Sequence, residues 1–363
     1  MKRMLLLTPA LTLILCACAH TNNEKKTSLH GTVVQSSSSY VSNLPARGID
    51  YSAKIERVAF GSCANQDEPQ PIWKTIAATH PDLFLFTGDN IYASWSGQQP
   101  IAEQYRKLDL VPEYRAVREK VPFMATWDDH DFGQRDGGVD WTGKDAARRD
   151  FMNYWTYTRN SMPLEQGGVY HSKIIGPKKQ TVQVIMLDTR YYRSPLKERP
   201  GFEGKAMNYI PQDEGTILGQ HQWEWLETQL KRPADVRFIV SSIQLIANDP
   251  QFEKWGNFPK ERQRFFDLVK STRAKNVIVI SGDRHIASIA KTDLNGYGPI
   301  YDVTASSLNR PNKYPDSDTH YVGATYNQEN FGLAEIDWKK KTVSLQIRDM
   351  DSKVVNSVEI KLK

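Results

Sequence analysis

The chain has 363 residues, of which 39% are hydrophobic and 25% are charged, and its formal net charge is +5. These values are ordinary for a globular protein, so they exclude a largely disordered chain and a collagen-like repeat. The small positive excess does not favour nucleic acid as a stable partner, although it suits an anionic substrate. The length allows one large domain or two average ones.

Residues 1–17 have the pattern of a secretory signal peptide, because Lys2 and Arg3 precede an apolar run that is short for a bilayer span. The following Leu-Cys-Ala-Cys at 15–18 resembles the lipobox of bacterial lipoproteins, which implies cleavage before Cys18 and lipidation of its thiol. We therefore predict an exported lipoprotein that is anchored to a membrane through Cys18 and faces the periplasm or the cell exterior. The alternatives are an ordinary secreted protein and an uncleaved signal anchor.

The mature chain divides into a tether and one domain. Residues 18–45 are rich in Ser, Asn, Lys and Thr, which is typical of a flexible linker between a lipid and a folded domain. From 46 to 363 apolar runs alternate with amphipathic stretches, and we interpret this part as a single domain. Cys63 has no cysteine partner within it, so in an oxidising compartment its thiol is either buried or bound to a metal.

The apolar runs of the domain predict strands, and the amphipathic stretches between them predict helices. In chain order the expected elements are a strand at 57–61, a helix at 71–79, strands at 83–87 and 123–127, a helix at 145–158, a strand at 181–188, a helix at 219–231, a strand at 237–242, a helix at 258–274, a strand at 277–281 and an antiparallel meander at 331–363. The sum is an α/β protein with one mixed sheet or two sheets packed face to face.

Residues suited to binding metals or phosphate come directly after five of the predicted strands, where α/β folds place their ligand sites. These segments are Gly-Ser-Cys at 61–63, Gly-Asp-Asn-Ile-Tyr at 88–92, Trp-Asp-Asp-His-Asp at 127–131, Asp-Thr-Arg at 188–190 and Gly-Asp-Arg-His at 282–285. Carboxylate, phenolate and imidazole groups are ligands of hard metal ions, and two adjacent ions can hold a phosphate between them. Asp89, beside Gly88, is the candidate that bridges two ions.

Three of these motifs resemble the PhoD-like (alkaline phosphatase D) branch of the calcineurin-like metallophosphatases: GDNIY at 88–92, WDDHD at 127–131 and SGDRH at 281–285. The resemblance extends from about residue 57 to residue 333. It implies a sandwich of two mixed β-sheets flanked by helices. It also implies metal-dependent hydrolysis of phosphate esters, by a phosphomonoesterase with phosphodiesterase activity.

The resemblance also implies roles for particular residues. Cys63 and Tyr92 match ligands of ferric iron (Fe3+), and Asp89 matches the bridging aspartate. The remaining matches are Asp129, Asp283 and His285 as further metal ligands, and His130 as the catalytic histidine near the leaving group. Arg190 is placed where its guanidinium can contact phosphate oxygens. Relatives in this branch imply calcium (Ca2+) as the partner of iron.

Two positions depart from the family pattern. Arg135 stands where we expect asparagine, and the histidine common after the fifth strand is replaced by a segment containing Gln244, an alternative oxygen ligand. Each motif also has a plainer explanation: Cys63 as core packing, His285 as a core histidine, and Asp128 to Asp131 as carboxylates that cap a helix.

Three functions therefore stay open from the sequence. The first is hydrolysis of phosphate esters by a monomeric enzyme with a metal-bound nucleophile and His130 as general acid. The second is a phospholipase C- or D-type phosphodiesterase that acts on lipid headgroups beside the membrane. The third is a lipoprotein that binds phosphorylated ligands without catalysis.

Overall fold

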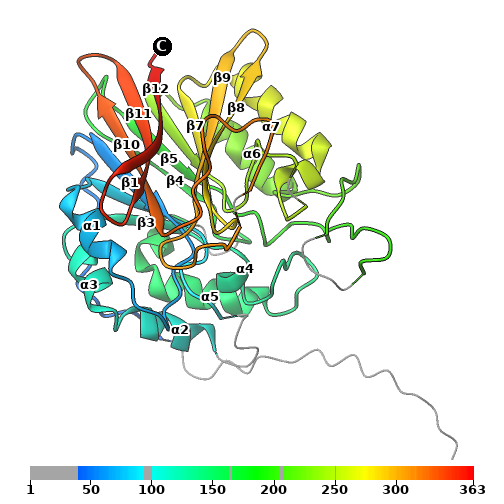
Figure 1. The fold of residues 1–363 in the computed structure, drawn as a ribbon, viewed down its shortest axis with the longest axis horizontal. Coiled ribbons are helices and arrows are strands. Elements are labelled where there is room, and N and C mark those ends of the chain that lie inside the picture. Colours follow the sequence, from blue (N-terminus) through cyan, green and yellow to red (C-terminus); the bar gives the residue numbers. More distant parts are fainter. Residues whose placement is uncertain (1–39, 94–99, 163–165, 204–207, 250, 315) are drawn as a thin grey trace, which may run out of the picture. The chain divides into compact units, whose positions relative to one another are not determined.

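The computed structural model describes residues 40–93, 100–162, 166–203, 208–249, 251–314 and 316–363. The predicted signal peptide, the lipidation site Cys18 and the tether up to residue 39 lie outside these ranges. Within them the chain folds into two β-sheets with helices on their outer sides (Figure 1).

The first half of the chain contains β1 (Arg57–Gly61), α1 (Ile72–Ala78), β2 (Leu83–Thr87), α2 (Ile101–Leu108), α3 (Pro112–Arg118), β3 (Phe123–Thr126), α4 (Asp129–Phe132), α5 (Lys144–Tyr154), the 3-10 helix η2 (Thr156–Asn160), β4 (His171–Ile175) and β5 (Val182–Met186). The second half contains α6 (Gly219–Leu230), β6 (Val236–Val240), η3 (Trp255–Asn257), α7 (Pro259–Thr272), β7 (Val277–Ser281), β8 (Ala287–Leu294), β9 (Gly298–Ala305), β10 (Asn330–Asp337), β11 (Thr342–Asp349) and β12 (Val354–Lys361).

Both sheets have six strands and mix parallel with antiparallel pairs. The first has the order β12-β11-β10-β1-β2-β3, and the second has the order β4-β5-β6-β7-β9-β8. The neighbours β1, β2 and β3 are parallel, as are β5, β6, β7 and β9. The carboxyl ends of these parallel strands meet at the lower side of the view in Figure 1, and the loops that follow them carry the candidate site residues.

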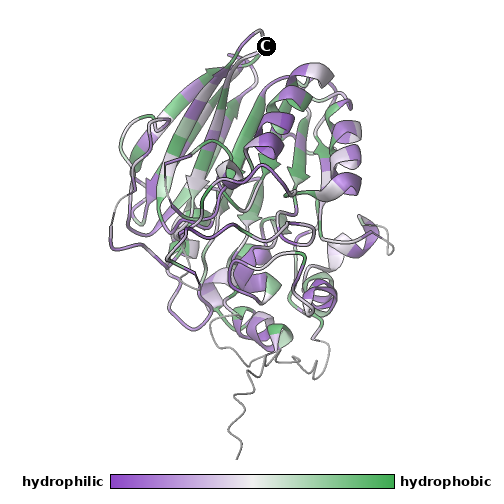
Figure 2. Cartoon of the chain, turned by 90° about the vertical axis from the view of Figure 1, so that its right-hand side faces the viewer, coloured by the Kyte–Doolittle hydropathy of each residue, from purple (hydrophilic) through white to green (hydrophobic). Residues whose placement is uncertain are grey.

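Three apolar clusters hold the layers together. One lies between the sheets and joins side chains such as Phe60 and Val240. A second packs α1, α2, α3 and α5 on the outer face of the first sheet, with Trp73 fully buried in it. The third packs α6 and α7 on the second sheet around Trp223. Figure 2 shows the consequence, because the strands are mostly green while the exposed sides of the helices are purple.

The expected sandwich of two mixed sheets is confirmed, and so is the meander, which forms one edge of the first sheet as β10, β11 and β12. The elements α2, α3, β4, β8 and β9 were not predicted. The short helices lack a long periodic pattern, β8 carries polar residues on its exposed half, and β9 begins with Gly298 and Pro299, which do not indicate a strand. Within the described residues, no helix is both long and apolar enough to cross a membrane.

The folded domain also begins earlier than expected. Tyr40 and Ser42, which belong to the predicted tether, donate hydrogen bonds from their hydroxyls to Asp109 Oδ2 at 2.5 and 2.6 Å. Asp109 also accepts a hydrogen bond from the hydroxyl of Tyr154 at 2.7 Å. The chain is therefore fixed on the domain from residue 40 onwards, beside the carboxyl end of α2.

Candidate metal centre

A cavity of about 230 Å³ lies where the loops after the parallel strands of the two sheets meet. Its wall includes Asp89, Asp129, His130, Asp283 and His285, which come from the loops after β2, β3 and β7. Residues separated by nearly two hundred positions in the sequence thus face one space.

Two overlapping groups of donor atoms lie close enough together to hold metal ions. In the first group, atoms of Cys63, Asp89 and His285 lie within 4.8 Å of one another, and in the second the same holds for Asp89, Asp129 and His130. Asp89 belongs to both groups, which is the geometry of a carboxylate shared between two ions. The Tyr92 hydroxyl adjoins the first group, at 3.0 Å from His285 Nε2.

A third group consists of carboxylates alone: Asp128, Asp129 and Asp283, again within 4.8 Å. Asp128 Oδ2 and Asp129 Oδ1 are buried, and neither accepts a hydrogen bond from any described residue. Buried carboxylate oxygens are normally hydrogen-bonded or bound to a metal. The donor set therefore fits cations: the first group with Tyr92 offers sulfur, phenol and imidazole beside Asp89, and the third group offers oxygen alone.

The backbone at four of these residues is in a conformation that L-amino acids seldom adopt. The φ angles are 61° at Cys63, 47° at Asp89, 69° at Asp283 and 56° at His285. Left-handed backbone at a non-glycine residue costs free energy and persists only where the surroundings hold it. These turns bring Asp89, Asp283 and His285 to the cavity wall and place the buried Cys63 beside Asp89 and His285, which plain core packing of Cys63 and His285 does not explain.

Gly88 allows the loops after β2 and β3 to approach each other. Its φ is 103°, and a Cβ atom there would lie 2.6 Å from the Cβ of Asp128 and 3.0 Å from that of Ser242. No larger residue fits without moving the third carboxylate group. The glycine of the GDNIY motif is thus required by the close packing of the acidic loops.

Burial and mutual repulsion disfavour the ionised forms of three of the acidic residues, whereas at Asp129 the nearby His130 and Arg190 outweigh burial and lower the pKa. Burial, together with the charges of Asp129 and Asp128, raises the pKa of Asp89 well above its ordinary value. The pKa of Asp283 is raised in the same way, by burial and then by Asp128. Burial raises the pKa of Asp128 to about 8, although Arg190 opposes the shift. Burial and the charge of Arg310 lower the pKa of His285 to about 3, so this imidazole is neutral and able to bind a cation.

Asp131 connects the segments that follow β2 and β3 through hydrogen bonds, and it does not line the cavity. Its Oδ1 accepts hydrogen bonds from the backbone N–H of Asn90 at 2.9 Å and from the Tyr105 hydroxyl at 3.2 Å, and its Oδ2 accepts one from the backbone N–H of Asp128 at 3.0 Å. The helix-capping explanation therefore applies to this member of the WDDHD motif, which fixes α4 and with it the position of His130.

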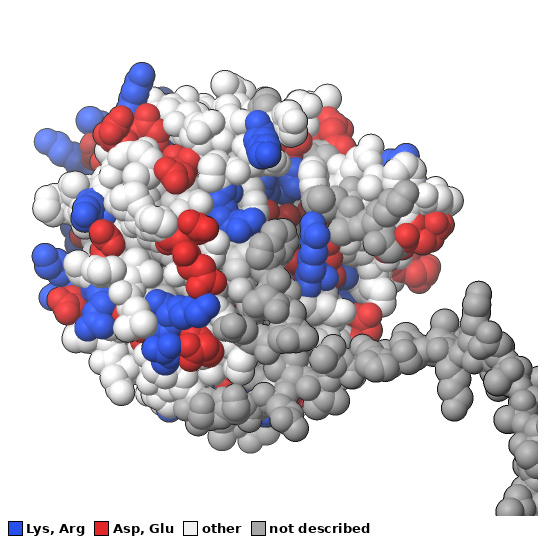
Figure 3. Space-filling view, turned by 60° about the horizontal axis from the view of Figure 1, so that its bottom comes forward, with Lys and Arg blue, Asp and Glu red and all other residues white. Residues whose placement is uncertain are grey.

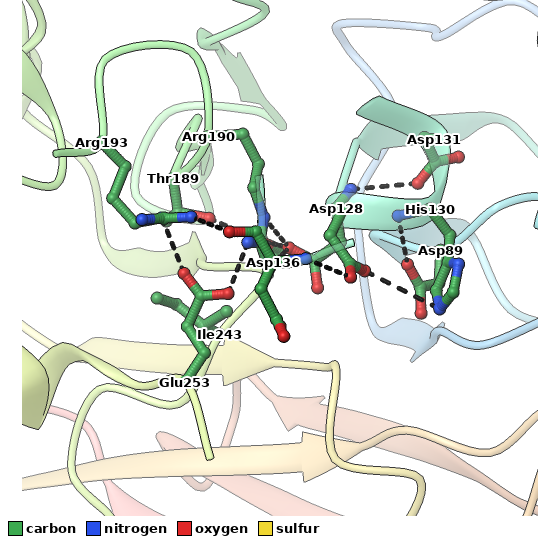
Figure 4. A network of polar contacts seen from close by, with 12 residues as sticks. Asp89, Asp128, His130, Asp131, Asp136, Thr189, Arg190, Arg193, Ile243 and Glu253 are labelled. Atoms are coloured by element: carbon green, nitrogen blue, oxygen red, sulfur yellow. Dashed lines mark hydrogen bonds and ion pairs between the residues drawn. The ribbon is translucent and has the colours of Figure 1, made fainter. Parts of the chain in front are cut away.

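The structure corrects the expectation that Arg190 contacts phosphate. Its side chain is fully buried and is absent from the cavity wall. The guanidinium donates from Nε to Asp128 Oδ1 at 2.6 Å and forms an ion pair with Glu253, which also pairs with Arg193 Nε at 2.8 Å (Figure 4). Arg190 is therefore the buried counter-ion of Asp128. Its position after a predicted strand did not show that its side chain points away from the cavity.

The Gln244 side chain also points elsewhere. Its amide Nε2 donates to the hydroxyls of Thr304 at 3.0 Å and Tyr321 at 3.1 Å, and the residue does not line the cavity. Its buried Oε1 accepts no hydrogen bond from the described residues, so its role as an oxygen ligand stays a prediction.

Arginines that the motifs did not single out as phosphate contacts line the cavity. They are Arg135, from the loop after α4, Arg284, between the two candidate ligands of the SGDRH motif, and Arg310, from the loop after β9. In Figure 3 basic side chains surround a recess near the middle of the view, with acidic atoms visible inside it. An acidic floor with basic residues around it suits an anion held through cations.

The structural role of Arg190 predicts a loss of stability when it is removed. Arg190→Ala leaves Asp128 and Glu253 buried without this counter-charge, so we expect the free energy of unfolding to fall by about 3–5 kcal/mol. Urea unfolding measures the change, and the exposed Arg199→Ala serves as a control that should change stability by less than about 0.5 kcal/mol. A variant of normal stability that binds phosphate poorly would instead support the original expectation for Arg190.

The crowded carboxylates predict a pH dependence for the metal-free protein. Because the pKa values of Asp89, Asp128 and Asp283 are raised on folding, the folded state binds more protons than the unfolded state above about pH 4. Stability is therefore lost as the pH rises towards about 8, and we expect the Tm of chelated protein to fall by about 5 °C or more between pH 5 and pH 8. Saturating metal should abolish the fall, and an equal slope with and without metal would contradict the assignment.

Comparisons with known proteins agree with the fold and the motifs. Residues 58–347 match the family model of the PhoD-like phosphatases. Alkaline phosphatase D of Bacillus subtilis is 24% identical over 275 residues, which cover 62% of this chain and 45% of that protein, so the chain spans less than half the length of this relative.

Solved structures share the fold at low identity. The structure of PhoD superimposes with a TM-score of 0.65 at 18% identity, covering 88% of this chain and 70% of that one. A purple acid phosphatase from seeds of yellow lupin (Lupinus luteus) has a TM-score of 0.57 at 14% identity, covering 85% of this chain and 54% of that one. Since the family match covers most of the chain, the protein belongs to the PhoD-like phosphatase family.

Proposed function

We propose that the protein hydrolyses phosphate esters with metal ions held by Cys63, Asp89, Tyr92, Asp129, Asp283 and His285. The observation that carries the proposal is the overlap of three donor groups at the cavity wall and directly behind it, with Asp89 and Asp129 each shared by two of them. Family membership supports the reaction type. When bound, such ions would activate water and neutralise charge on the phosphoryl oxygens.

The donor types favour two different cations. Cys63, Tyr92 and His285 supply sulfur, phenolate and imidazole, which suits ferric iron. The Asp128, Asp129 and Asp283 group supplies oxygen alone, which suits calcium. Asp128 thereby joins the candidate ligands, and Ser242 and Arg190 orient its carboxylate from behind, the former through a hydrogen bond of 2.5 Å.

His130 has the position of a proton donor to the leaving oxygen. Its imidazole lines the cavity, and its ring centroid lies 4.2 Å from that of Tyr92. Its Nε2 is 4.0 Å from Asp129 Oδ1, and its backbone N–H donates to Asp89 Oδ1 at 3.4 Å. Burial lowers the pKa of His130, while Asp129 opposes the shift. A lowered pKa favours the neutral imidazole, so the role of proton donor requires that the bound substrate keeps His130 protonated.

The decisive variant is Asp89→Asn. We expect kcat/KM for p-nitrophenyl phosphate to fall by at least about 100-fold, because the shared ligand of two ions loses its charge. In chelated protein the same variant should be at least as stable as the wild type, since one of the repelling carboxylates is gone. The exposed Asp140→Asn is the matched control for both measurements. Wild-type turnover in metal-replete Asp89→Asn protein would rule the assignment out.

The proposed setting is a bacterial membrane, to which Cys18 attaches the domain through a lipid so that the domain faces the periplasm or the cell exterior. The support is the lipobox resemblance of residues 15–18 together with the polar segment that follows. Cys18→Ser should abolish the incorporation of a labelled fatty acid into the protein. Labelling of the variant at the wild-type level would contradict lipidation of Cys18.

Phosphodiesters, including lipid headgroups, are a second candidate substrate class. One feature of the surface favours them: a groove adjoins the cavity. His285 and Arg310 line both the cavity and this groove. A groove beside the metal centre provides space for a second alcohol on the phosphate.

A further inference from the structure

Asp128, Asp129 and Asp283 form the group of carboxylates that offers oxygen alone, and two of them are held in the same way. Asp128 Oδ1 accepts a hydrogen bond from Arg190 Nε at 2.6 Å, and Asp129 Oδ2 accepts one from the backbone N–H of Asp136 at 2.8 Å. The other oxygens, Asp128 Oδ2 and Asp129 Oδ1, are buried and accept no hydrogen bond from the described part of the chain. Each carboxylate is therefore fixed through one oxygen, and its second oxygen remains for a cation.

Glu253 connects these two arrangements (Figure 4). Its Oε2 forms an ion pair with Arg190, which holds Asp128, and its Oε1 lies 2.8 Å from Arg193 Nε. Arg193 in turn donates from Nη2 to the backbone carbonyl of Asp136. The side chains of Arg190, Arg193 and Glu253 are all buried. One buried carboxylate thus lies behind both candidate ligands, with an arginine leading from it to each of them.

Tyr209 fixes Asp136 through a second contact. The Tyr209 hydroxyl donates to Asp136 Oδ2 at 2.7 Å, and its backbone N–H donates to the Gln251 carbonyl at 3.0 Å. The φ angle of Asp136 is 47°, a left-handed conformation that persists only where the surroundings hold it. Arg193 holds the carbonyl of this residue and Tyr209 holds its carboxylate. Together they direct the backbone N–H of Asp136 towards the Asp129 carboxylate.

The other end of the metal centre has a different support. Ser306, which follows β9, contacts Cys63 Sγ at 3.1 Å and accepts the backbone N–H of His285 at 2.9 Å. Glu253 lies in the segment between β6 and η3, and Tyr209 lies in the segment between β5 and α6. Since separate segments support the two ends, a change at Glu253 or Tyr209 should reach the oxygen-only group first.

We propose that Glu253 and Tyr209 are positioning residues that set the cation affinity of the oxygen-only group without contacting the ion. Glu253 acts through Arg190 and Arg193, and Tyr209 acts through Asp136. Groups that orient metal ligands in this way commonly change metal affinity by about 10–100-fold when they are removed. The inference rests on the cation site of the proposed function and adds the residues that determine how tightly the site binds.

Tyr209→Phe tests the proposal, because it removes one hydroxyl and leaves the ring. On full-length protein loaded with iron and stripped of calcium, we expect the Kd for Ca2+, measured by calorimetric titration, to rise by about tenfold. The visible charge-transfer absorption of phenolate bound to ferric iron should keep its wild-type intensity. Tyr297→Phe is the matched control, since the Tyr297 hydroxyl also donates one hydrogen bond of 2.7 Å, to the Ala274 carbonyl, and the residue does not line the cavity.

Glu253→Gln is the second variant. It keeps the shape of the side chain but removes the charge that both arginines share, so we expect the Kd for Ca2+ to rise by about 10–100-fold. Glu261→Gln is its control, because Glu261 is also a buried carboxylate with hydrogen bonds, to Trp223 and Ile217, and lies outside the cavity wall. Tyr209→Phe carries the test alone if Glu253→Gln does not fold.

The outcomes separate this inference from the function on which it rests. A folded Tyr209→Phe protein whose Kd for Ca2+ stays within twofold of the wild type overturns the positioning role and leaves the proposed function standing. Equal loss of the ferric absorption and of calcium affinity also overturns the positioning role, because it indicates general structural damage. Wild-type protein that binds calcium but does not hydrolyse p-nitrophenyl phosphate overturns the proposed function and leaves the positioning role standing.

Discussion

The confinement of like charges governs this structure. Asp89, Asp128, Asp129 and Asp283 are brought close together at one cavity by segments that follow the strands, and burial makes their repulsion expensive. A fold that keeps four carboxylates so close needs positive charge from elsewhere. Protons supply it in the metal-free protein at low pH, and cations supply it at neutral pH. Stability and metal binding are therefore two aspects of one electrostatic requirement.

The protein itself compensates only part of this charge. Arg190 neutralises Asp128 on the side away from the cavity, and Glu253 and Arg193 complete a buried chain of alternating charges (Figure 4). Because Arg190 is held from behind, Asp128 keeps one oxygen directed away from the ion pair and without a hydrogen bond from the described residues. The network thus fixes the direction of the Asp128 carboxylate and leaves one of its oxygens without a hydrogen bond. This is the arrangement expected when a neighbour such as Arg190 orients a metal ligand.

The sequence predicted the fold and the convergence of the motifs because both depend on short-range patterns. Buried strands such as β2 and β7 are continuous apolar runs, and parallel strands bring the residues after them to a common edge. The prediction that Arg190 contacts phosphate failed because its partner Glu253 is 63 positions away in the sequence. No local pattern shows that the Arg190 guanidinium points inward towards that carboxylate. Arg310 was missed because it lies in a long loop whose path is set by hydrogen bonds such as those between Asn309 and Asn65.

The hydrogen bonds of the loop after β9 connect the candidate metal ligands to the groove beside the cavity. Ser306 donates to or accepts from Cys63 Sγ at 3.1 Å and accepts the backbone N–H of His285 at 2.9 Å, so the segment that begins the loop after β9 also supports two candidate ligands. Three residues later Asn309 fixes the wall of the groove, and Arg310 follows at the junction. One short segment therefore supports two candidate ligands, forms part of the wall of the adjoining groove and places Arg310 where the cavity and the groove meet. Changes in this segment are expected to alter metal affinity and the shape of the cavity together.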